Sequence, residues 1–377
     1  MAFHDSCRIL LLLSTLFLTF QASYGAVVPK RRATVCNGHA ELCSRSYGNV
    51  TFMGAHDSFA FSEDPLILSR DQSVDIPTQL GLGVRLLQAQ SHVKDGELHF
   101  CHTSCTLFDG GTVEDYLKTV KTFLDENPNE VLTLLFTNPE SQSVKDVWKP
   151  AFDNSGITPL AFVPPSVPVK QSEWPTLGEM IDSGKRVVVF LDAGADTSQV
   201  NFILPEFEMI WETPFSVTDD TFPCSVDRVS GPLAVEDHTY MINHSLNKNI
   251  LPIGDGVIVS DPLDASTTNA VDSIMANVAG CTPLGANRNP QFVLLDFVDV
   301  GEGLKAVNLL NGLPASPAPT STPTIGNQSS NVDPTSTQSN GVLSMRIGPP
   351  SLSKLFDPRS NPRSGKEGFS GMMTRSQ

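Results

Sequence analysis

Apolar and β-branched residues recur along the chain in short runs that are nearly continuous rather than alternating. We expect strands at residues 49–53, 84–89, 131–136, 186–191, 207–211, 240–243, 257–260 and 292–298. Strands that are apolar on both faces are typical of parallel sheets. Amphipathic patterns predict helices between them, for example at 113–126 and 268–278. About eight such strands in roughly 280 residues favour a single-domain α/β fold, a distorted (β/α) TIM-type barrel, over an open sheet.

The two ends of the chain differ in composition from this predicted domain, which covers residues 33–312. Arg8, the apolar run 9–20 and the small residues up to Ala26 predict a signal peptide at 1–26. The run is shorter than the roughly 20 apolar residues that cross a bilayer, so no stable membrane span is expected. Residues 313–377 are rich in Ser, Thr and Pro and predict a disordered tail. We therefore expect a secreted protein, extracellular or associated with the cell surface or cell wall.

Six cysteines remain once Cys7 is assigned to the signal peptide, and an even number suits an oxidising compartment with up to three disulfides. One pairing that leaves no thiol over joins Cys36 with Cys43, Cys101 with Cys105, and Cys224 with Cys281. The alternative is a zinc site built from His99, Cys101, His102 and Cys105. Three sequons for N-glycosylation begin at Asn49, Asn243 and Asn327.

The formal net charge of the chain is −16 at pH 7, and the acidic excess lies in the predicted domain. A surface of this sign repels nucleic acid and anionic membranes. We therefore expect no nucleic-acid partner.

Polar residues stand where the predicted strands end. They are His56, Asp57, Gln88, Gln90, Asn138, Asp192, Glu212, Asn243, His244, Asp261, Asp296 and Asp299. Barrel enzymes build their sites at the carboxyl ends of their strands, so this recurrence indicates a pocket. Capping and turn formation is the alternative, especially for Asp261 before Pro262 and Asp299 near Gly301.

Two of these segments carry histidines, namely 54–58 (Gly-Ala-His-Asp-Ser) and 98–102 (Leu-His-Phe-Cys-His). Together with 83–85 (Gly-Val-Arg) and the last strand 292–297 (Phe-Val-Leu-Leu-Asp-Phe), they resemble the X-region of phosphatidylinositol-specific phospholipase C. The chain is most similar to the secreted fungal branch of phospholipase C-like phosphodiesterases. The resemblance covers residues 45–300, with the four segments in the family's order.

The resemblance implies a mechanism with two histidines. His56 would be the general base that takes the proton of a neighbouring substrate hydroxyl, which then attacks phosphorus and forms a cyclic phosphodiester. His102 would protonate the leaving alcohol. By the same analogy Asp296 would partner His56 and Asp57 would partner His102. Arg85 would clamp the phosphate, or alternatively form a salt bridge across the base of the barrel.

The second strand departs from the family pattern. Where the family usually has an acidic residue, together with a further metal ligand or an arginine, this chain has Gln88 and Gln90. Neutral amides donate hydrogen bonds but carry no charge, so we predict neither a metal nor another cofactor. At the third and fourth strand ends only Asp192 matches a group that binds sugar hydroxyls. The predicted substrate-binding residues are thus Arg85, Gln88, Gln90 and Asp192.

These features predict a metal-independent phosphoric diester hydrolase whose substrate is a phospholipid or another lipid- or glycan-linked phosphodiester. The alternative is a catalytically degenerate barrel that acts as an extracellular binding protein. A metal-dependent glycerophosphodiesterase or sphingomyelinase D type of barrel also uses two histidines, but it requires acidic ligands where Gln88 and Gln90 stand.

Overall fold

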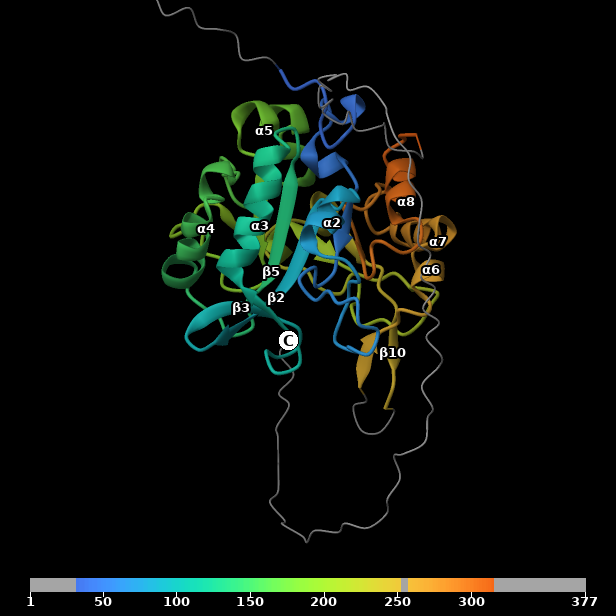
Figure 1. The fold of residues 1–377 in the computed structure, drawn as a ribbon. Coiled ribbons are helices and arrows are strands. Elements are labelled where there is room, and N and C mark those ends of the chain that lie inside the picture. The colour runs from blue at the N-terminus through green and yellow to red at the C-terminus, as the bar shows by residue number, and fades with distance from the viewer. Residues whose placement is uncertain (1–31, 252–256, 315–377) are drawn as a thin grey trace, which may run out of the picture. The chain divides into compact units, whose positions relative to one another are not determined.

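The computed structural model describes residues 32–251 and 257–314, so the predicted signal peptide and nearly all of the predicted tail lie outside the described residues. Eight parallel strands form one curled sheet in the order β7-β6-β5-β2-β1-β12-β9-β8 (Figure 1). They are β1 (Phe52–Ala55), β2 (Leu86–Lys94), β5 (Leu132–Thr137), β6 (Val187–Leu191), β7 (Ile203–Pro205), β8 (Ile210–Glu212), β9 (Thr239–Asn243) and β12 (Phe292–Leu295). The distorted barrel predicted from the sequence is confirmed.

The α-helices are α2 (Ile76–Gly81), α3 (Val113–Glu126), α4 (Lys149–Ser155), α5 (Leu177–Ser183), α6 (Ala265–Thr268), α7 (Val271–Cys281) and α8 (Gly303–Leu310). Short 3-10 turns lie at Ala40–Leu42, Tyr47–Asn49, Thr158–Leu160, Gln171–Glu173, Glu206–Glu208 and Val235–Asp237, and a π-helical turn at Val144–Trp148. Figure 1 shows α2 and α3 beside β2 and β5. The Thr112 side chain begins α3 by accepting a hydrogen bond from the Asp115 N–H, which satisfies a backbone donor that the helix leaves free.

Two predicted strands differ from the structure. Residues 257–260 contain β11 (Ile258–Ser260), which pairs antiparallel with β10 (Asn247–Asn249) in a separate hairpin rather than in the barrel. The eighth strand of the barrel sheet is instead β7, at the edge beside β6, whose three residues are too few to give a strong apolar signal. The run 207–211 is divided between the turn Glu206–Glu208 and β8.

Alternate residues of the barrel strands pack into two different cores. Phe52, Leu86 and Phe292 belong to the cluster inside the barrel, which Tyr47 and Trp174 close at the amino ends of the strands. The intervening residues of the same strands pack in the cluster that includes helices α3 and α7. Successive side chains of a strand point to opposite faces of the sheet. A strand residue that is an even number of positions from Phe52, Leu86 or Phe292 therefore faces the barrel interior, and one at an odd separation faces the helices.

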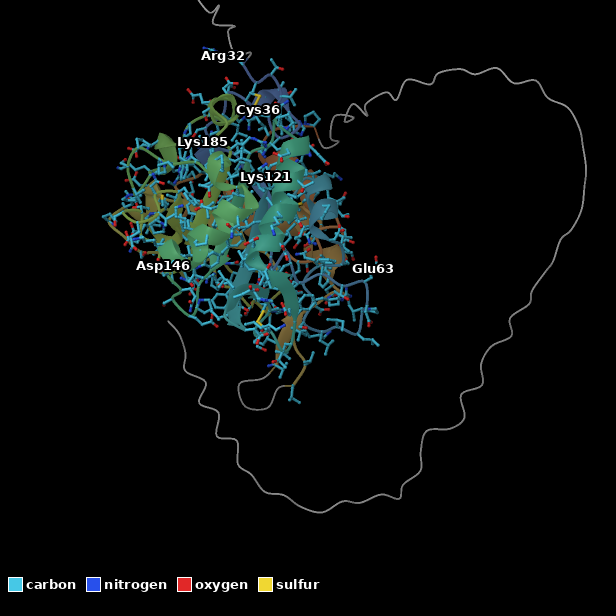
Figure 2. All side chains as sticks on the ribbon, turned by 60° about the vertical axis from the view of Figure 1, so that its left-hand side comes forward. Arg32, Cys36, Glu63, Lys121, Asp146 and Lys185 are labelled. Atoms are coloured by element: carbon cyan, nitrogen blue, oxygen red, sulfur yellow. A yellow bond between two sulfur atoms is a disulfide. The ribbon has the colours of Figure 1, made fainter. Side chains whose placement is uncertain are left out.

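Three disulfides cross-link the described residues: Cys36–Cys43, Cys101–Cys105 and Cys224–Cys281. Figure 2 labels Cys36 near the start of the described chain. The predicted pairing is confirmed, and the alternative zinc site is wrong because Cys101 and Cys105 are bonded to each other. No helix among the described residues has the length and apolar character to cross a membrane.

Candidate active site

The inward-facing side of each barrel strand changes from apolar to polar at the carboxyl end. His56 continues the inward positions of β1, Gln88 and Gln90 those of β2, Asp192 those of β6, Glu206 those of β7, Glu212 those of β8, Asn243 those of β9, and Asp296 those of β12. Since the strands are parallel, these polar side chains gather at one end of the barrel, where barrel enzymes place their chemistry.

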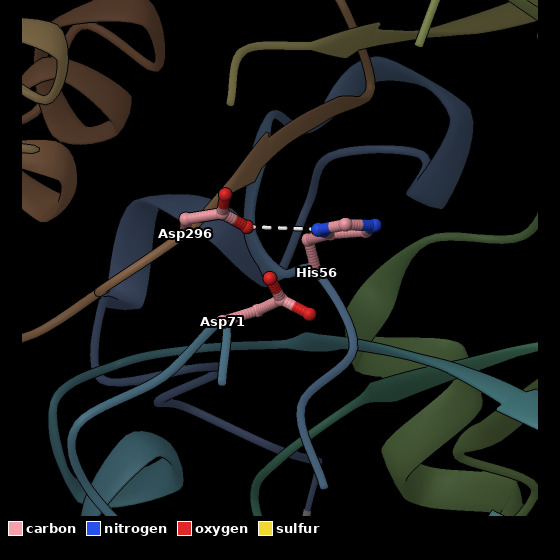
Figure 3. Close-up of side chains that lie close together, drawn as sticks. All are labelled: His56, Asp71 and Asp296. Atoms are coloured by element: carbon pink, nitrogen blue, oxygen red, sulfur yellow. Dashed lines mark hydrogen bonds and ion pairs between the residues drawn. The ribbon is translucent and has the colours of Figure 1, made fainter. Parts of the chain in front are cut away.

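His56 is held by Asp296 from the neighbouring strand β12. Its Nδ1 lies 2.8 Å from Asp296 Oδ1, as Figure 3 shows. The Gln72 amide fixes both strand ends by donating hydrogen bonds to the carbonyls of His56 and Leu295. Burial alone would lower the pKa of His56, but the carboxylates of Asp296, Asp57 and Asp71, with Asp296 contributing most, together outweigh burial and raise that pKa to about 10. The partnership that the resemblance implied for His56 is therefore present in the structure.

His102 directly follows β3 (Glu97–Cys101), which pairs antiparallel with the outer half of β2 and returns the chain to the barrel mouth. Its Nδ1 lies 2.8 Å from the Ser69 carbonyl oxygen, and its Nε2 lies 3.8 Å from Asp57 Oδ2. Asp57 is thus an ionic neighbour of His102 rather than its hydrogen-bond partner. Burial lowers the pKa of His102, but the carboxylates of Asp71 and Asp57 outweigh this effect and raise it.

Asp71 also lies beside the two histidines, although nothing in the sequence indicated a role for it. The loop that follows β1 folds back, and the Asp71 N–H donates to the Ala60 carbonyl. This places one Asp71 oxygen 3.1 Å from His102 Nδ1. Asp71 also groups with His56 and Asp296, with one atom of each side chain within 4.8 Å of the others. Burial raises the pKa of Asp71 to about 7. An aspartate in a loop ordinarily indicates only a turn, so the sequence carried no signal for this position.

Gln88 and Gln90 hold the backbone beside the two histidines. The Gln88 side-chain oxygen accepts the Asp57 N–H at 2.7 Å, and the Gln90 side-chain oxygen accepts the Thr103 N–H at 2.6 Å. In addition, Asp57 Oδ1 accepts the Gln90 N–H. Asp57 and Thr103 both have positive φ, of 34° and 61°, so these hydrogen bonds stabilise turns that L-residues rarely adopt. Both oxygens are therefore committed to the protein, which leaves the NH2 groups as the ends suited to a phosphate.

Asp192 belongs to a second polar cluster at the ends of β6, β7 and β8. Its Oδ1 accepts the Asn138 N–H at 2.7 Å, and burial raises its pKa. Glu212 pairs with Arg228, whose guanidinium also lies over the Phe215 ring. Glu206 is 1% exposed, and burial and the neighbouring Glu212 raise its pKa well above the usual range. Of this cluster, only Asp192 was among the predicted substrate-binding residues, although Asn138 and Glu212 were among the polar strand-end residues.

Arg85 lies at the other end of β2, and the prediction that it clamps a phosphate is corrected. Its Nε donates to Glu130 at 2.7 Å, and its Nη1 donates to the carbonyls of Leu80 and Val84. The guanidinium also packs over the Phe123 ring. Arg85 alternates with the inward-facing Leu86, so it faces the helices and forms the salt bridge that was its alternative role.

The residues at β2 do not fit a calcium site, because they are amides whose oxygens already accept backbone N–H groups. Two groups of described side chains do bring three nitrogen and oxygen atoms within 4.8 Å: His56, Asp71 and Asp296, and Asp57, Asp71 and His102. In each group the histidine Nδ1 is engaged by Asp296 or by the Ser69 carbonyl.

Comparison with known families gives a match to the family described as PI-PLC X 1, over residues 42–311. The chain belongs to the PI-PLC X domain family. A relative from Arthroderma benhamiae named PI-PLC X domain-containing protein 1 is 41% identical over 304 residues, which cover 79% of this chain and 95% of that protein. A second protein of that fungus, named an uncharacterized secreted protein, is 41% identical over 270 residues, 71% of this chain and 60% of its own length.

This PI-PLC X domain is also similar to solved bacterial structures. The phosphatidylinositol-specific phospholipase C of Staphylococcus aureus is 15% identical, with a TM-score of 0.46 over 72% of this chain and 99% of that one. The enzyme from Listeria monocytogenes is 14% identical, with a TM-score of 0.45 over 72% of this chain and 96% of that one.

Proposed function

We propose that this protein is a secreted phosphoric diester hydrolase of the phospholipase C type, with His56 as general base and His102 as general acid. One observation carries the proposal: each imidazole is held through Nδ1, by Asp296 and by the Ser69 carbonyl respectively. Neither Nε2 atom has a hydrogen bond among the described residues, although His102 Nε2 lies 3.8 Å from Asp57 Oδ2, so both can exchange protons with a substrate. The two side chains are 28% and 22% exposed, so a substrate can contact them.

The chemistry follows from this arrangement. His56 takes the proton of a substrate hydroxyl while that oxygen bonds to phosphorus, and His102 gives its proton to the alcohol oxygen whose bond to phosphorus breaks. Asp296 holds the His56 ring and stabilises the imidazolium that forms. The NH2 groups of Gln88 and Gln90 would donate hydrogen bonds to the phosphoryl oxygens. Because the metal-binding acidic residues of β2 are replaced by these amides, we propose that the reaction needs no metal.

A lipid substrate is supported by exposed apolar side chains beside the histidines. Leu66 and Leu107 are 82% and 62% exposed. The Ser69 side chain donates to the Leu107 carbonyl, and the Ser69 carbonyl contacts His102, so Leu107 adjoins the site. Leu66 lies three residues before Ser69 in the same loop. Leu263 is also exposed and lies three residues after Ser260, whose hydroxyl donates a hydrogen bond to Asp71. Apolar side chains of this kind can enter a lipid interface, which compensates for the repulsion between the acidic protein and an anionic membrane.

The experiment is a panel of phosphodiester substrates assayed with a chelator present: phosphatidylinositol vesicles, phosphatidylcholine vesicles and a glycan-linked phosphodiester. Wild type is compared with His56→Ala and His102→Ala, and with His99→Ala as a matched control, since His99 lies on the same hairpin but pairs with Asp109. We expect wild type and the control to release product and each site variant to lose at least about 100-fold in kcat/KM.

Turnover by either site variant at the wild-type rate would contradict the two-histidine mechanism. Loss of wild-type activity in the chelator would contradict metal independence. Binding of a phosphodiester by the wild-type protein without any product would instead support the extracellular binding protein.

A further inference from the structure

Among the described residues, Asp71 is the carboxylate that belongs to both polar groups of the site. It groups with His56 and Asp296 on one side and with Asp57 and His102 on the other, with atoms within 4.8 Å in each group. Figure 3 shows its carboxylate beside His56 and Asp296. The side chain is 1% exposed, so water does not screen its charge from either imidazole.

The two oxygens of Asp71 have different surroundings. Oδ1 accepts a hydrogen bond from the Ser260 hydroxyl, which ties Asp71 to β11. Oδ2 has no hydrogen-bond partner among the described residues, although His102 Nδ1 lies 3.1 Å away. A buried polar atom without a partner is costly in a structural role. A positive charge on the neighbouring ring compensates for that cost.

The hydrogen bond from His102 Nδ1 to the Ser69 carbonyl requires a proton on Nδ1. The second proton, on Nε2, is the one a general acid must carry, and it makes the ring positive. Asp71 lies close enough to Nδ1 to stabilise that charge without displacing the carbonyl. The other charged or titratable groups that face this pair are Asp57, His56 and Asp296.

We propose that Asp71 is a positioning residue that keeps His102 in the doubly protonated form in which it can act as the general acid. This rests on the proposed function. Asp71 does not itself contact the substrate: it acts through the ring of His102. Its own proton and that of His102 are therefore linked, because the ionised carboxylate favours the imidazolium and the imidazolium favours the ionised carboxylate.

The test is Asp71→Asn in the full secreted chain, since asparagine keeps an oxygen that can accept from Ser260 but removes the charge. The primary readout is the pH titration of His102 by NMR of ¹³C-labelled histidine, which needs no substrate. An opposite charge at this distance raises a histidine pKa by about one unit or more, so we expect the His102 midpoint to fall by at least that amount. Ser260→Ala, which loses the hydrogen bond but keeps the carboxylate, is the matched control and should leave the midpoint within a few tenths of a unit.

Activity gives the second readout. We expect Asp71→Asn to lower kcat about 10-fold or more on substrates with an alkyl alcohol leaving group, to change KM little, and to move the alkaline limb of the pH profile down with the His102 midpoint. Asp71→Glu should restore part of the shift. An unchanged His102 midpoint in folded Asp71→Asn would overturn the proposal.

If Asp71→Asn does not fold, the link between Asp71 and His102 can be tested by titrating both groups in the wild-type protein. Linked protons predict that the Asp71 carboxyl carbon and the His102 ring respond at shared pH midpoints, and independent midpoints would refute the link. If the wild-type protein cleaves none of the phosphodiesters, the proposed function is wrong. The NMR titration of the histidines would still test whether Asp71 raises the pKa of His102.

Discussion

Replacing Asp296 with asparagine tests how the general base is prepared. The variant keeps the size of the side chain but removes the charge that faces His56 Nδ1 across 2.8 Å. A hydrogen bond to a charged group contributes about 1.5–3 kcal/mol. Since one pKa unit corresponds to about 1.4 kcal/mol, the pKa of His56 should fall by about one to two units from its value of about 10.

Two changes in the kinetics follow from this substitution, one in the pH profile of kcat/KM and one in the maximal rate. His56 must be neutral to accept a proton, so kcat/KM of the wild type should rise with pH above neutrality, and the rising limb should lie about one to two units lower in Asp296→Asn. The maximal rate should fall by about 100-fold or more, because the ring is less well oriented and its charge less well stabilised.

Stability gives an independent measure of the same pair. Because folding raises the pKa of His56 from 6.5 to about 10, the pair's contribution to the free energy of unfolding is complete below pH 6.5 and is lost as the pH rises through about 10. Urea unfolding of wild type and Asp296→Asn across this range should show a gap that narrows with increasing pH. A constant gap, together with an unmoved His56 midpoint in the NMR titration, would refute this account of the base.

Three further predictions concern regions around the site. Arg85→Ala should lower the free energy of unfolding by about 3 kcal/mol in urea titrations, because it breaks the largely buried ion pair with Glu130, and it should leave KM unchanged. A raised KM would indicate that Arg85 contacts the substrate after all. Replacing Leu66 and Leu107 with serine should weaken activity on lipid vesicles at least several-fold but not on a short-chain monomeric substrate, and equal losses on both would contradict a lipid-facing role. Peptide mass spectrometry of protein produced through a fungal secretory pathway should find a glycan on Asn49, which is exposed, and none on Asn243, which is buried and donates to the Thr213 carbonyl; the reverse pattern would be inconsistent with this fold.

Much of the barrel could be predicted because its strands are apolar on both faces and its polar residues follow the strand ends. The β7 strand could not, because three residues between turns carry too little periodicity. The opposite error arose at 257–260, where an apolar run belongs to a hairpin outside the barrel. Apolar character alone does not distinguish a barrel strand from a hairpin strand that packs beside it.

Which site residues face the barrel interior could be predicted from the alternation of side chains along each strand. His56 and Asp296 are in phase with the interior, and Arg85 is out of phase with Gln88, so its outward direction could have been inferred from the same count. Asp71 could not be found in this way. Its position depends on a loop that returns to the barrel mouth through contacts far apart in the sequence, including the hydrogen bond from Ser260.

The central claim is that His56 is the base and His102 the acid, and the dependence on the leaving group tests it most directly. The measurement uses a phosphodiester that the wild type cleaves, prepared once with its alkyl alcohol leaving group and once with p-nitrophenol, which departs without a proton. The account predicts that His102→Ala loses about 100- to 10,000-fold on the first substrate and keeps near wild-type activity on the second, while His56→Ala is impaired on both. Equal impairment of His102→Ala on the two substrates, or rescue of His56→Ala by p-nitrophenol, would contradict it.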